Sequence, residues 1–163
     1  MSFAKPVCVN DYEEIARHTL PRNAWDYYAS GADSMQTLAD NTAAFSKIRL
    51  RPRILVDVSN VSMTTSVLGH TIRNPICVAP SAMQRMAADH GECANARACA
   101  AMKNCMILSS WSTTSLEEVA AAGNAVCSAQ EVPSHLPSPV RWFQLYVYKD
   151  RATTYSLVKR AEK

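Results

Sequence analysis

Hydrophobic and polar residues follow one pattern in the first part of the chain and another in the second. In the first part, three short helices are predicted. The first is capped by Asn10 with Glu13 as its box partner, the second lies within "NAWDYYASGA", and the third is capped by Asp33. The alternation in "SMTTSVLGHTIRN", centred on Leu68-Gly69-His70, predicts a small hairpin.

From Asn74 onward, short continuous apolar runs alternate with helical segments. The runs are "PICVAP", "CMILSS" and "VRWFQLYVYKD", and the helical segments are "GECANARACAAM", "TSLEEVAAAG" and "RATTYSLVKRAEK". Ser115 and Glu118 form an S-x-x-E capping box, and Gly123 stands where that helix is expected to stop. Strands that are apolar on both faces and alternate with helices indicate an α/β fold with a parallel sheet.

The third apolar run has two different faces. In strand geometry one face carries Trp142, Gln144 and Tyr146, and the other carries Phe143, Leu145 and Val147. The second face is apolar, as expected for the side covered by helices. The first face ends in hydrogen-bonding groups, which suggests either an edge that turns to solvent or the wall of a site.

Polar groups follow the ends of all three predicted strands. Ser109 and Trp111 share a face at the end of the second run, Gln144 and Tyr146 do so in the third, and backbone amides follow Pro80. Ligands bind at the carboxyl ends of strands in parallel α/β folds. A hydroxyl, an amide, a phenol and a large ring suit a planar heterocycle with hydrogen-bonding groups. The alternative is that Trp111 and Tyr146 are core aromatics with satisfied polar groups.

The segment Asn124–Pro139 interrupts this order. It contains three prolines and little periodicity, and it is long for a connection between a helix and a strand, which usually takes about 2–6 residues. The composition predicts a disordered surface loop.

Composition and charge exclude several functions. The chain has 163 residues and a net charge of +3 without a charge run, so neither nucleic acid nor an anionic membrane is an expected partner. No apolar stretch approaches the roughly 18 residues of a membrane span, and no secretory signal core is present. The six cysteines form no C-x-x-C pair and are expected to be buried thiols, and the four isolated histidines predict no metal site.

Several long segments of the sequence resemble one family. They are "DYYASGADSMQTLADN", "FSKIRLRPRIL", "MTTSVLGHTIRNPICVAPSAMQRMA", "LSSWSTTSLEEVA" and "WFQLYVYKDR". They are similar to the FMN-dependent α-hydroxy-acid oxidases and dehydrogenases, which include glycolate oxidase and hydroxyacid oxidase. The resemblance implies that residues 1–163 are the N-terminal part of such a domain. The implied fold is a partial TIM (β/α)₈ barrel with N-terminal helices, a small hairpin and the first three βα units, and with residues 124–139 inserted.

The resemblance implies a cofactor site for FMN. The backbone around Pro80, Ser81 and Ala82 is expected to pass the flavin ring, and Ser109 and Gln144 are expected to hydrogen-bond its polar edge. The redox chemistry in such enzymes belongs to the cofactor, and the protein supplies orientation and electrostatics.

The resemblance also implies a substrate site. Tyr27 is expected to bind the substrate carboxylate. Tyr146, the expected catalytic residue of this chain, would hydrogen-bond near the substrate hydroxyl. Trp111 would limit substrate size toward short acids such as glycolate.

The implied activity is that of an (S)-2-hydroxy-acid oxidase, which forms a 2-oxo acid and reduces O₂ to hydrogen peroxide. The family's histidine base, arginine clamp, active-site lysine and phosphate loops lie in later strands, so we expect the 163-residue chain to be inactive alone. The alternative hypothesis is a non-catalytic truncated isoform or gene-model fragment that binds full-length subunits or is degraded. Full-length relatives are expected to be peroxisomal homotetramers. The peroxisomal tripeptide is absent from this sequence, and the alternative location is the cytoplasm.

Overall fold

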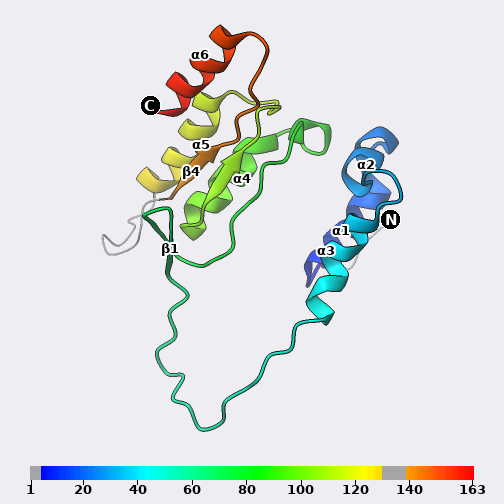
Figure 1. Cartoon of the computed structure of the whole chain (residues 1–163), viewed down its shortest axis with the longest axis vertical. Coiled ribbons are helices and arrows are strands. Elements are labelled where there is room, and N and C mark those ends of the chain that lie inside the picture. The colour runs from blue at the N-terminus through cyan, green and yellow to red at the C-terminus, as the bar shows by residue number, and fades with distance from the viewer. Residues whose placement is uncertain (1–4, 130–138) are drawn as a thin grey trace. The chain divides into compact units, whose positions relative to one another are not determined.

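The computed structural model describes residues 5–129 and 139–163. It divides into two compact units, Met1–Asn60 and Val61–Lys163 (Figure 1). The first unit contains three helices. The second contains a hairpin, a parallel sheet and the helices that cover it.

The helices of the first unit are α1 (Val9–Thr19), α2 (Arg22–Ala29) and α3 (Gln36–Ser46), as the sequence predicts. Both predicted caps are wrong. The Asp11 carboxylate accepts hydrogen bonds from the backbone N–H groups of Val7 (2.7 Å) and Cys8 (3.0 Å), which places the start of α1 ahead of Asn10. Asp33 has a φ of 47° and lies in the preceding turn, so that Met35 occupies the N-cap of α3.

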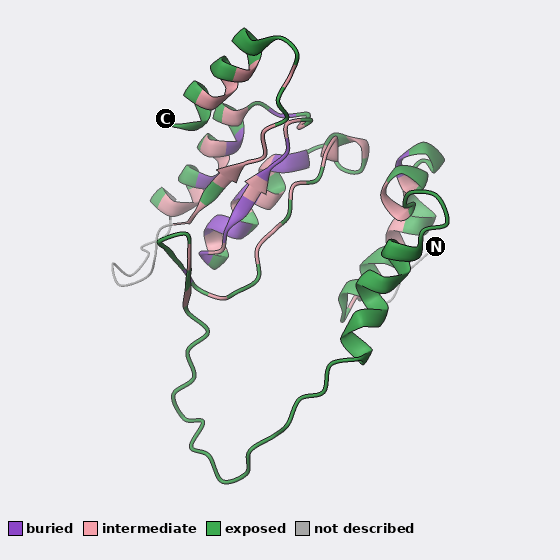
Figure 2. Ribbon diagram, in the orientation of Figure 1, coloured by how far each residue is buried: buried purple, intermediate pink, exposed green. Residues whose placement is uncertain are grey.

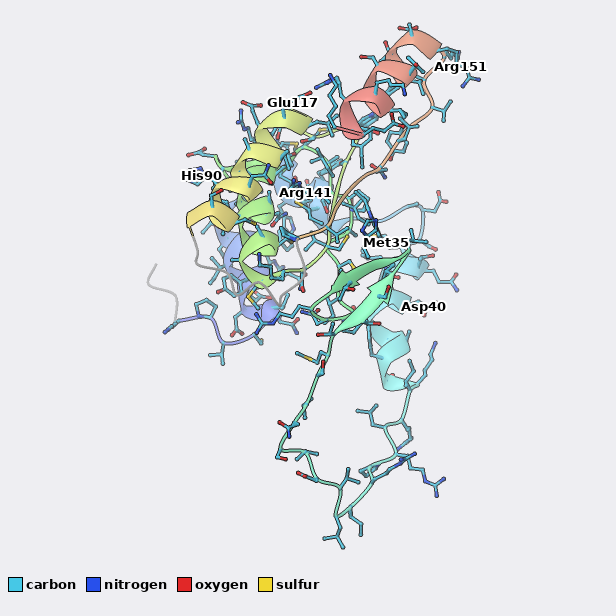
Figure 3. The ribbon with its side chains drawn as sticks, turned by 90° about the vertical axis from the view of Figure 1, so that its left-hand side faces the viewer. Met35, Asp40, His90, Glu117, Arg141 and Arg151 are labelled. Atoms are coloured by element: carbon cyan, nitrogen blue, oxygen red, sulfur yellow. The ribbon has the colours of Figure 1, made fainter. Side chains whose placement is uncertain are left out.

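The first unit has little core of its own. Among its described residues only Ala24 is buried. The large apolar side chains of α3, Leu38 and Phe45, are exposed, and Phe45 is 76% accessible. Figure 3 shows the side chains of this helix and of the irregular stretch that follows it standing clear of the ribbon. Three helices of at most 11 residues bury too little surface to form a core together.

The second unit begins with the predicted hairpin. Strands β1 (Thr65–Val67) and β2 (His70–Ile72) pair antiparallel, with Thr65 opposite Ile72. The two residues of the turn, Leu68 and Gly69, have φ values of 48° and 80°. Two successive positive φ angles are the signature of the type I′ turn, whose twist matches that of the strands it joins.

The sheet of the second unit is parallel, as predicted, but its strands are short. Strand β3 (Met106–Leu108) pairs with β4 (Arg141–Phe143). The first apolar run contributes one bridge, in which Val78 N–H donates to Cys105 O (3.0 Å) and Ile107 N–H donates to Val78 O (3.0 Å). The prediction of a full first strand is therefore wrong. The three segments nevertheless lie side by side in the same order as along the chain.

Helices α4 (Gly91–Met102), α5 (Leu116–Ala129) and α6 (Arg151–Ala161) follow the three segments. Figure 2 shows that burial is concentrated where α4 and α5 meet the sheet. The core consists of Ala96, Cys99, Met106, Leu108 and Val119, with Val78 and Phe143 packed against it. Phe143 thus faces the helices as predicted. Val147 does not: it is 63% exposed, because β4 ends at Phe143.

Helix α5 begins as predicted and ends later than predicted. The Ser115 N–H and hydroxyl donate to the Glu118 carboxylate (3.1 and 2.7 Å), which completes the capping box. Gly123 does not stop the helix. It is buried, and a Cβ there would lie 3.2 Å from Arg141 Nη1, so glycine permits close packing. The predicted irregular loop is therefore wrong over residues 124–129, which are helical, while residues 130–138 lie outside the described part of the chain.

All six cysteines are free. Cys99 and Cys105 are buried, and burial raises the pKa of the Cys105 thiol to about 11. Cys8 is exposed and Cys77, Cys93 and Cys127 are half-buried, so the prediction of buried thiols is confirmed only for Cys99 and Cys105.

Candidate functional site

The predicted polar residues at the carboxyl ends of β3 and β4 lie close together. Gln144 N–H donates to Leu108 O (2.8 Å), which continues the parallel pairing one residue beyond β4. In this register Ser109 and Gln144 fall on the face of the sheet opposite to the core residues Leu108 and Phe143. The two side chains predicted to meet one ligand therefore belong to one face.

Ser110 fixes the segment after β4 to the end of β3. Its hydroxyl donates to Gln144 O (2.5 Å) and accepts from Tyr146 N–H (3.0 Å). Its backbone N–H donates to Gln144 Oε1 (3.3 Å). We did not predict a role for Ser110 from the sequence. The available signal was a hydroxyl at a position that the alternation assigns to the apolar face.

The two donor groups at this edge retain protons for a ligand. Ser109 is buried, and its Oγ accepts from Trp111 N–H (3.1 Å), so the hydroxyl keeps its own proton to donate. Gln144 uses Oε1 as an acceptor for Ser110, which leaves the Nε2 protons for donation. A hydroxyl and an amide NH₂ side by side match a ligand edge that carries acceptors.

Trp111 and Tyr146 form an aromatic pair beside these donors. Their ring centroids are 5.9 Å apart with an interplanar angle of 79°, an edge-to-face arrangement. Trp111 is 52% exposed and Tyr146 is 47% exposed, so neither is a core aromatic. The pair presents an indole and a phenol at the open side of the strand ends.

The loop after Val78 lies against the loop after β3. Met83 N–H donates to Trp111 O (3.0 Å), and Ser81 O accepts from the Gln84 side chain (3.2 Å). The backbone of Pro80, Ser81 and Ala82, predicted to pass a flavin ring, is thereby held next to the segment that carries Ser109.

Tyr27 is the predicted site residue that belongs to the first unit. It lies on α2, is 44% exposed, and its ring packs edge-to-face on that of Tyr28 with the centroids 5.1 Å apart. Its contact with a substrate stays a prediction.

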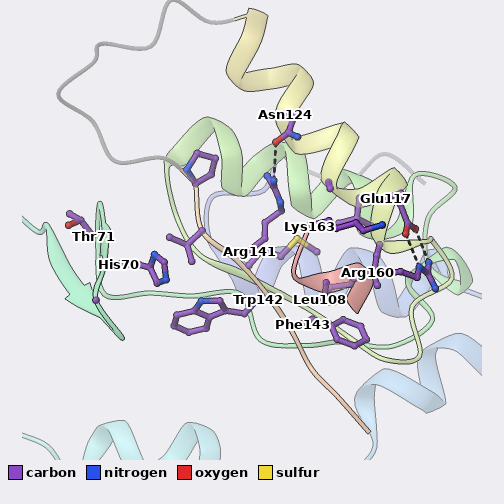
Figure 4. A pocket seen from close by; sticks show the side chains of 18 residues that line it. His70, Thr71, Leu108, Glu117, Asn124, Arg141, Trp142, Phe143, Arg160 and Lys163 are labelled. Atoms are coloured by element: carbon purple, nitrogen blue, oxygen red, sulfur yellow. Dashed lines mark hydrogen bonds and ion pairs between the residues drawn. The ribbon is translucent and has the colours of Figure 1, made fainter. Parts of the chain in front are cut away.

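A separate cavity of about 690 Å³ opens beside α5, α6 and β4 (Figure 4). Both arginines in its wall are engaged: Arg141 donates to Asn124 Oδ1 (2.9 Å), and Arg160 binds Glu117 through two bonds of 2.8 Å. The hydrogen bonds from Arg160 lower the pKa of Glu117 to about 2. Ser109, Trp111, Gln144 and Tyr146 do not line this cavity, so it is distinct from the strand-end site.

Within residues 5–129 and 139–163, no three His, Cys, Asp or Glu side chains are grouped so that they could hold a metal ion. None of the described helices is long and apolar enough to cross a membrane.

Comparison with known proteins identifies the family. Residues 16–163 match the FMN-dependent dehydrogenase family, and the chain belongs to that family. The chain is 50% identical to human 2-hydroxyacid oxidase 1 over 157 residues, which are 96% of this chain and 39% of that protein. It is 52% identical to glycolate oxidase of Spinacia oleracea over 155 residues, 95% of this chain and 38% of that enzyme. The chain thus spans about two fifths of the length of these relatives.

Solved structures agree with this assignment. A mutant of flavocytochrome b2 superimposes with a TM-score of 0.84 at 34% identity, over 97% of this chain and 39% of that one. A mandelate oxidase mutant with (S)-mandelic acid gives 0.83 at 32% identity, over 97% of this chain and 43% of that one. The predicted family and the α/β fold class are confirmed, and FMN is the cofactor that the family uses.

The strand-end site fits part of a flavin. The isoalloxazine edge carries carbonyl oxygens and ring nitrogens, and such groups can accept hydrogen bonds from a hydroxyl and an amide of the kind that Ser109 and Gln144 provide. The exposed pair of Trp111 and Tyr146 lies at the same strand ends as these two donors. The donor set of this chain therefore matches the polar edge of the ring system.

Proposed function

We propose that this chain forms the N-terminal part of an FMN-dependent (S)-2-hydroxy-acid oxidase that converts a short acid such as glycolate to the 2-oxo acid. The observation that carries the proposal is the pair of donors, Ser109 and Gln144, on one face of the strand ends beside an exposed indole and phenol. The relatives named 2-hydroxyacid oxidase and glycolate oxidase, at 50% and 52% identity, support the same activity.

In this proposal the second unit is the first part of a TIM (β/α)₈ barrel. The successive βα units are the segment around Val78 with α4, β3 with α5, and β4 with α6. The proposed insertion, residues 124–139, lies between the second and third units and overlaps the end of α5. The parallel pairing, and helices α4 and α5 packed on one face, support this assignment.

Three segments of this chain would hold the cofactor ring. Backbone at Pro80, Ser81 and Ala82 passes the ring, and the Ser109 hydroxyl and Gln144 amide donate to its polar edge. When bound, FMN accepts two electrons from the hydroxy acid and passes them on. The protein contributes orientation and fixed donors, which stabilise negative charge that develops on the ring edge.

Three side chains would contact the substrate. The Tyr146 phenol hydrogen-bonds near the hydroxyl that loses its proton. The Trp111 indole, in edge-to-face contact with Tyr146, limits the length of the acid. Tyr27 of the first unit binds the carboxylate.

The proposed setting follows the same family. O₂ is the electron acceptor and is reduced to hydrogen peroxide, the assembled enzyme is a homotetramer, and its location is the peroxisome. The competing hypothesis is a chain that binds full-length subunits without catalysing turnover.

A chimera tests the proposal. Residues 16–163 of this chain replace the matching part of spinach glycolate oxidase, and the purified chimera is examined by its visible spectrum. We expect bound FMN, bleached by glycolate under anaerobic conditions and recovered with peroxide formation in air. A folded chimera that binds FMN but is not bleached would refute the proposed activity. A folded chimera without flavin would refute the proposed site.

A further inference from the structure

Glu92, in the first turn of α4, is a fully buried carboxylate outside the site described above. Its side chain is 0% exposed. Its oxygens accept hydrogen bonds from Gln84 N–H (3.1 Å), Thr113 N–H (2.9 Å), the Thr113 hydroxyl (2.8 Å) and the Thr114 hydroxyl (2.7 Å). All of these partners are amides or hydroxyls.

These bonds keep a buried charge in place. Burial would raise the pKa of Glu92, but hydrogen bonds from the Thr113 backbone and from the Thr114 and Thr113 hydroxyls outweigh it and lower the pKa to about 2. The carboxylate is therefore ionised at neutral pH. An ionised group in the interior is tolerated when its oxygens are hydrogen-bonded, as these are.

The donors come from two loops that follow different strand segments. Gln84 belongs to the loop after Val78, and Thr113 and Thr114 belong to the loop after β3. The same loops also touch directly, since Arg85 N–H donates to Thr113 Oγ1 (3.2 Å). Glu92 therefore lies beneath the junction of the loop that carries Pro80–Ala82 and the loop that carries Ser109 and Trp111.

Gly91 lets the start of α4 approach this junction. Its φ is +43°, and a Cβ there would lie 2.8 Å from Arg85 Cγ and 3.3 Å from Arg85 N. A side chain at position 91 would push α4 away from the loop. Gly91 therefore allows the close approach that brings the Glu92 carboxylate to its hydrogen-bond donors.

We propose that Glu92 is a positioning residue, whose carboxylate holds the two loops at the spacing that lets the backbone at Ala82 and the hydroxyl of Ser109 meet one flavin ring. This inference rests on the proposed function, because the loops are taken to be flavin-binding elements. Glu92 itself contacts neither cofactor nor substrate. It acts through Gln84, Thr113 and Thr114.

Amide hydrogen exchange of the full chain, followed by NMR, tests the clamp. In Glu92→Leu, which keeps a similar volume without acceptors, the amides of Gln84, Thr113 and Met83 should exchange about tenfold faster or more. The amide of Ala152, which is bonded to Asp150 Oδ1 at the exposed start of α6 and exchanges by local opening, should keep its rate. In Glu92→Gln, the exchange rates of these loop amides should lie between those of the wild type and those of Glu92→Leu. The reason is that the remaining carbonyl oxygen can still accept hydrogen bonds from both loops.

Two results of the exchange experiment would overturn the inference. One is an unchanged rate at Gln84 and Thr113 in Glu92→Leu. The other is an equal acceleration at Ala152, which would mean that the effect is not confined to the loop junction. Glu13→Gln, an exposed glutamate on α1, is the matched control and should change none of these rates.

A titration of the chimera with FMN, followed by the flavin absorption band, separates this inference from the proposed function. We expect the chimera to bind FMN with a Kd that rises about tenfold in Glu92→Leu and less in Glu92→Gln. An equal Kd in the unsubstituted chimera and in Glu92→Leu would refute the positioning role. If the folded, unsubstituted chimera binds no FMN, it is the proposed function that fails, and the exchange rates still decide whether Glu92 joins the loops.

Discussion

Replacing Glu92 by glutamine should destabilise the second unit in a way that depends on pH. The substitution keeps the shape of the side chain and removes its charge from a site where four hydrogen bonds converge on it. The pKa of Glu92 is about 2, against an ordinary value of 4.5. Since one pKa unit corresponds to about 1.4 kcal/mol, the ionised carboxylate stabilises the folded state by up to about 3 kcal/mol.

The pH window follows from the direction of this shift. Because the folded-state pKa lies below the ordinary value of 4.5, the stabilisation is complete above about pH 4.5 and is lost as the pH falls toward 2. Glu92→Gln should therefore lower the free energy of unfolding at pH 7 and have a shrinking effect below pH 4. Urea unfolding followed by circular dichroism at several pH values measures both quantities.

Glu117→Gln provides a sharp comparison. The pKa of Glu117 is also about 2, lowered by the hydrogen bonds from Arg160, but its side chain is 60% exposed. Exposed ion pairs contribute little because water and salt screen them. Glu117→Gln should therefore change stability much less than Glu92→Gln. Equal losses in the two variants, or a Glu92→Gln effect that does not vary with pH, would refute the reasoning.

Four further substitutions test other parts of the account. Gly91→Ala, with a positive φ of 43° and a Cβ 2.8 Å from Arg85 Cγ, should cost about 1–3 kcal/mol in urea unfolding, and an unchanged midpoint would contradict the close approach. Ser110→Ala should speed hydrogen exchange at the Tyr146 amide and cost about 1–2 kcal/mol; an unchanged Tyr146 rate would show that the hydroxyl does not hold this segment. In the chimera, Tyr146→Phe should slow flavin reduction with FMN still bound, and loss of FMN would show that the assigned role is wrong. Trp111→Ala should widen acceptance toward longer hydroxy acids, and an unchanged chain-length profile would count against its role in limiting size.

Local patterns predicted the elements of this chain well where local interactions decide them. The helix at Gly91–Met102, the small hairpin centred on Leu68-Gly69-His70, and the capping box of Ser115 and Glu118 were all predicted from neighbouring residues. The parallel pairing followed from the alternation of apolar runs and helices. Each of these features is stabilised mainly by contacts close in sequence or by a repeated pattern.

The errors occur where distant contacts decide the outcome. Gly123 has the local character of a helix stop, but its close packing against Ala96 and Arg141 keeps it inside α5. The run around Val78 has the composition of a full strand, yet one bridge to Met106 is all that pairs. Strand length depends on partners in space, and these cannot be read from the run itself.

The candidate site shows the same division. Ser109, Trp111, Gln144 and Tyr146 could be proposed from the polar ends of the strands. Glu92 was missed, because a glutamate in a first helical turn is normally a solvated residue that favours the helix dipole. Its burial is tolerated because the hydroxyls of Thr113 and Thr114, more than twenty residues away in the sequence, donate hydrogen bonds to its carboxylate.

The Gln144 amide offers the most direct test of the flavin site. Gln144→Glu in the chimera keeps an oxygen that can accept from Ser110 N–H and replaces the donor NH₂ by a negatively charged oxygen. Asn124→Asp makes the same chemical change on α5, where an oxygen still accepts from Arg141. If the flavin edge meets Gln144, the Kd for FMN should rise tenfold or more in Gln144→Glu and stay unchanged in Asn124→Asp. Equal FMN affinity in the two variants would contradict the site proposed for this chain.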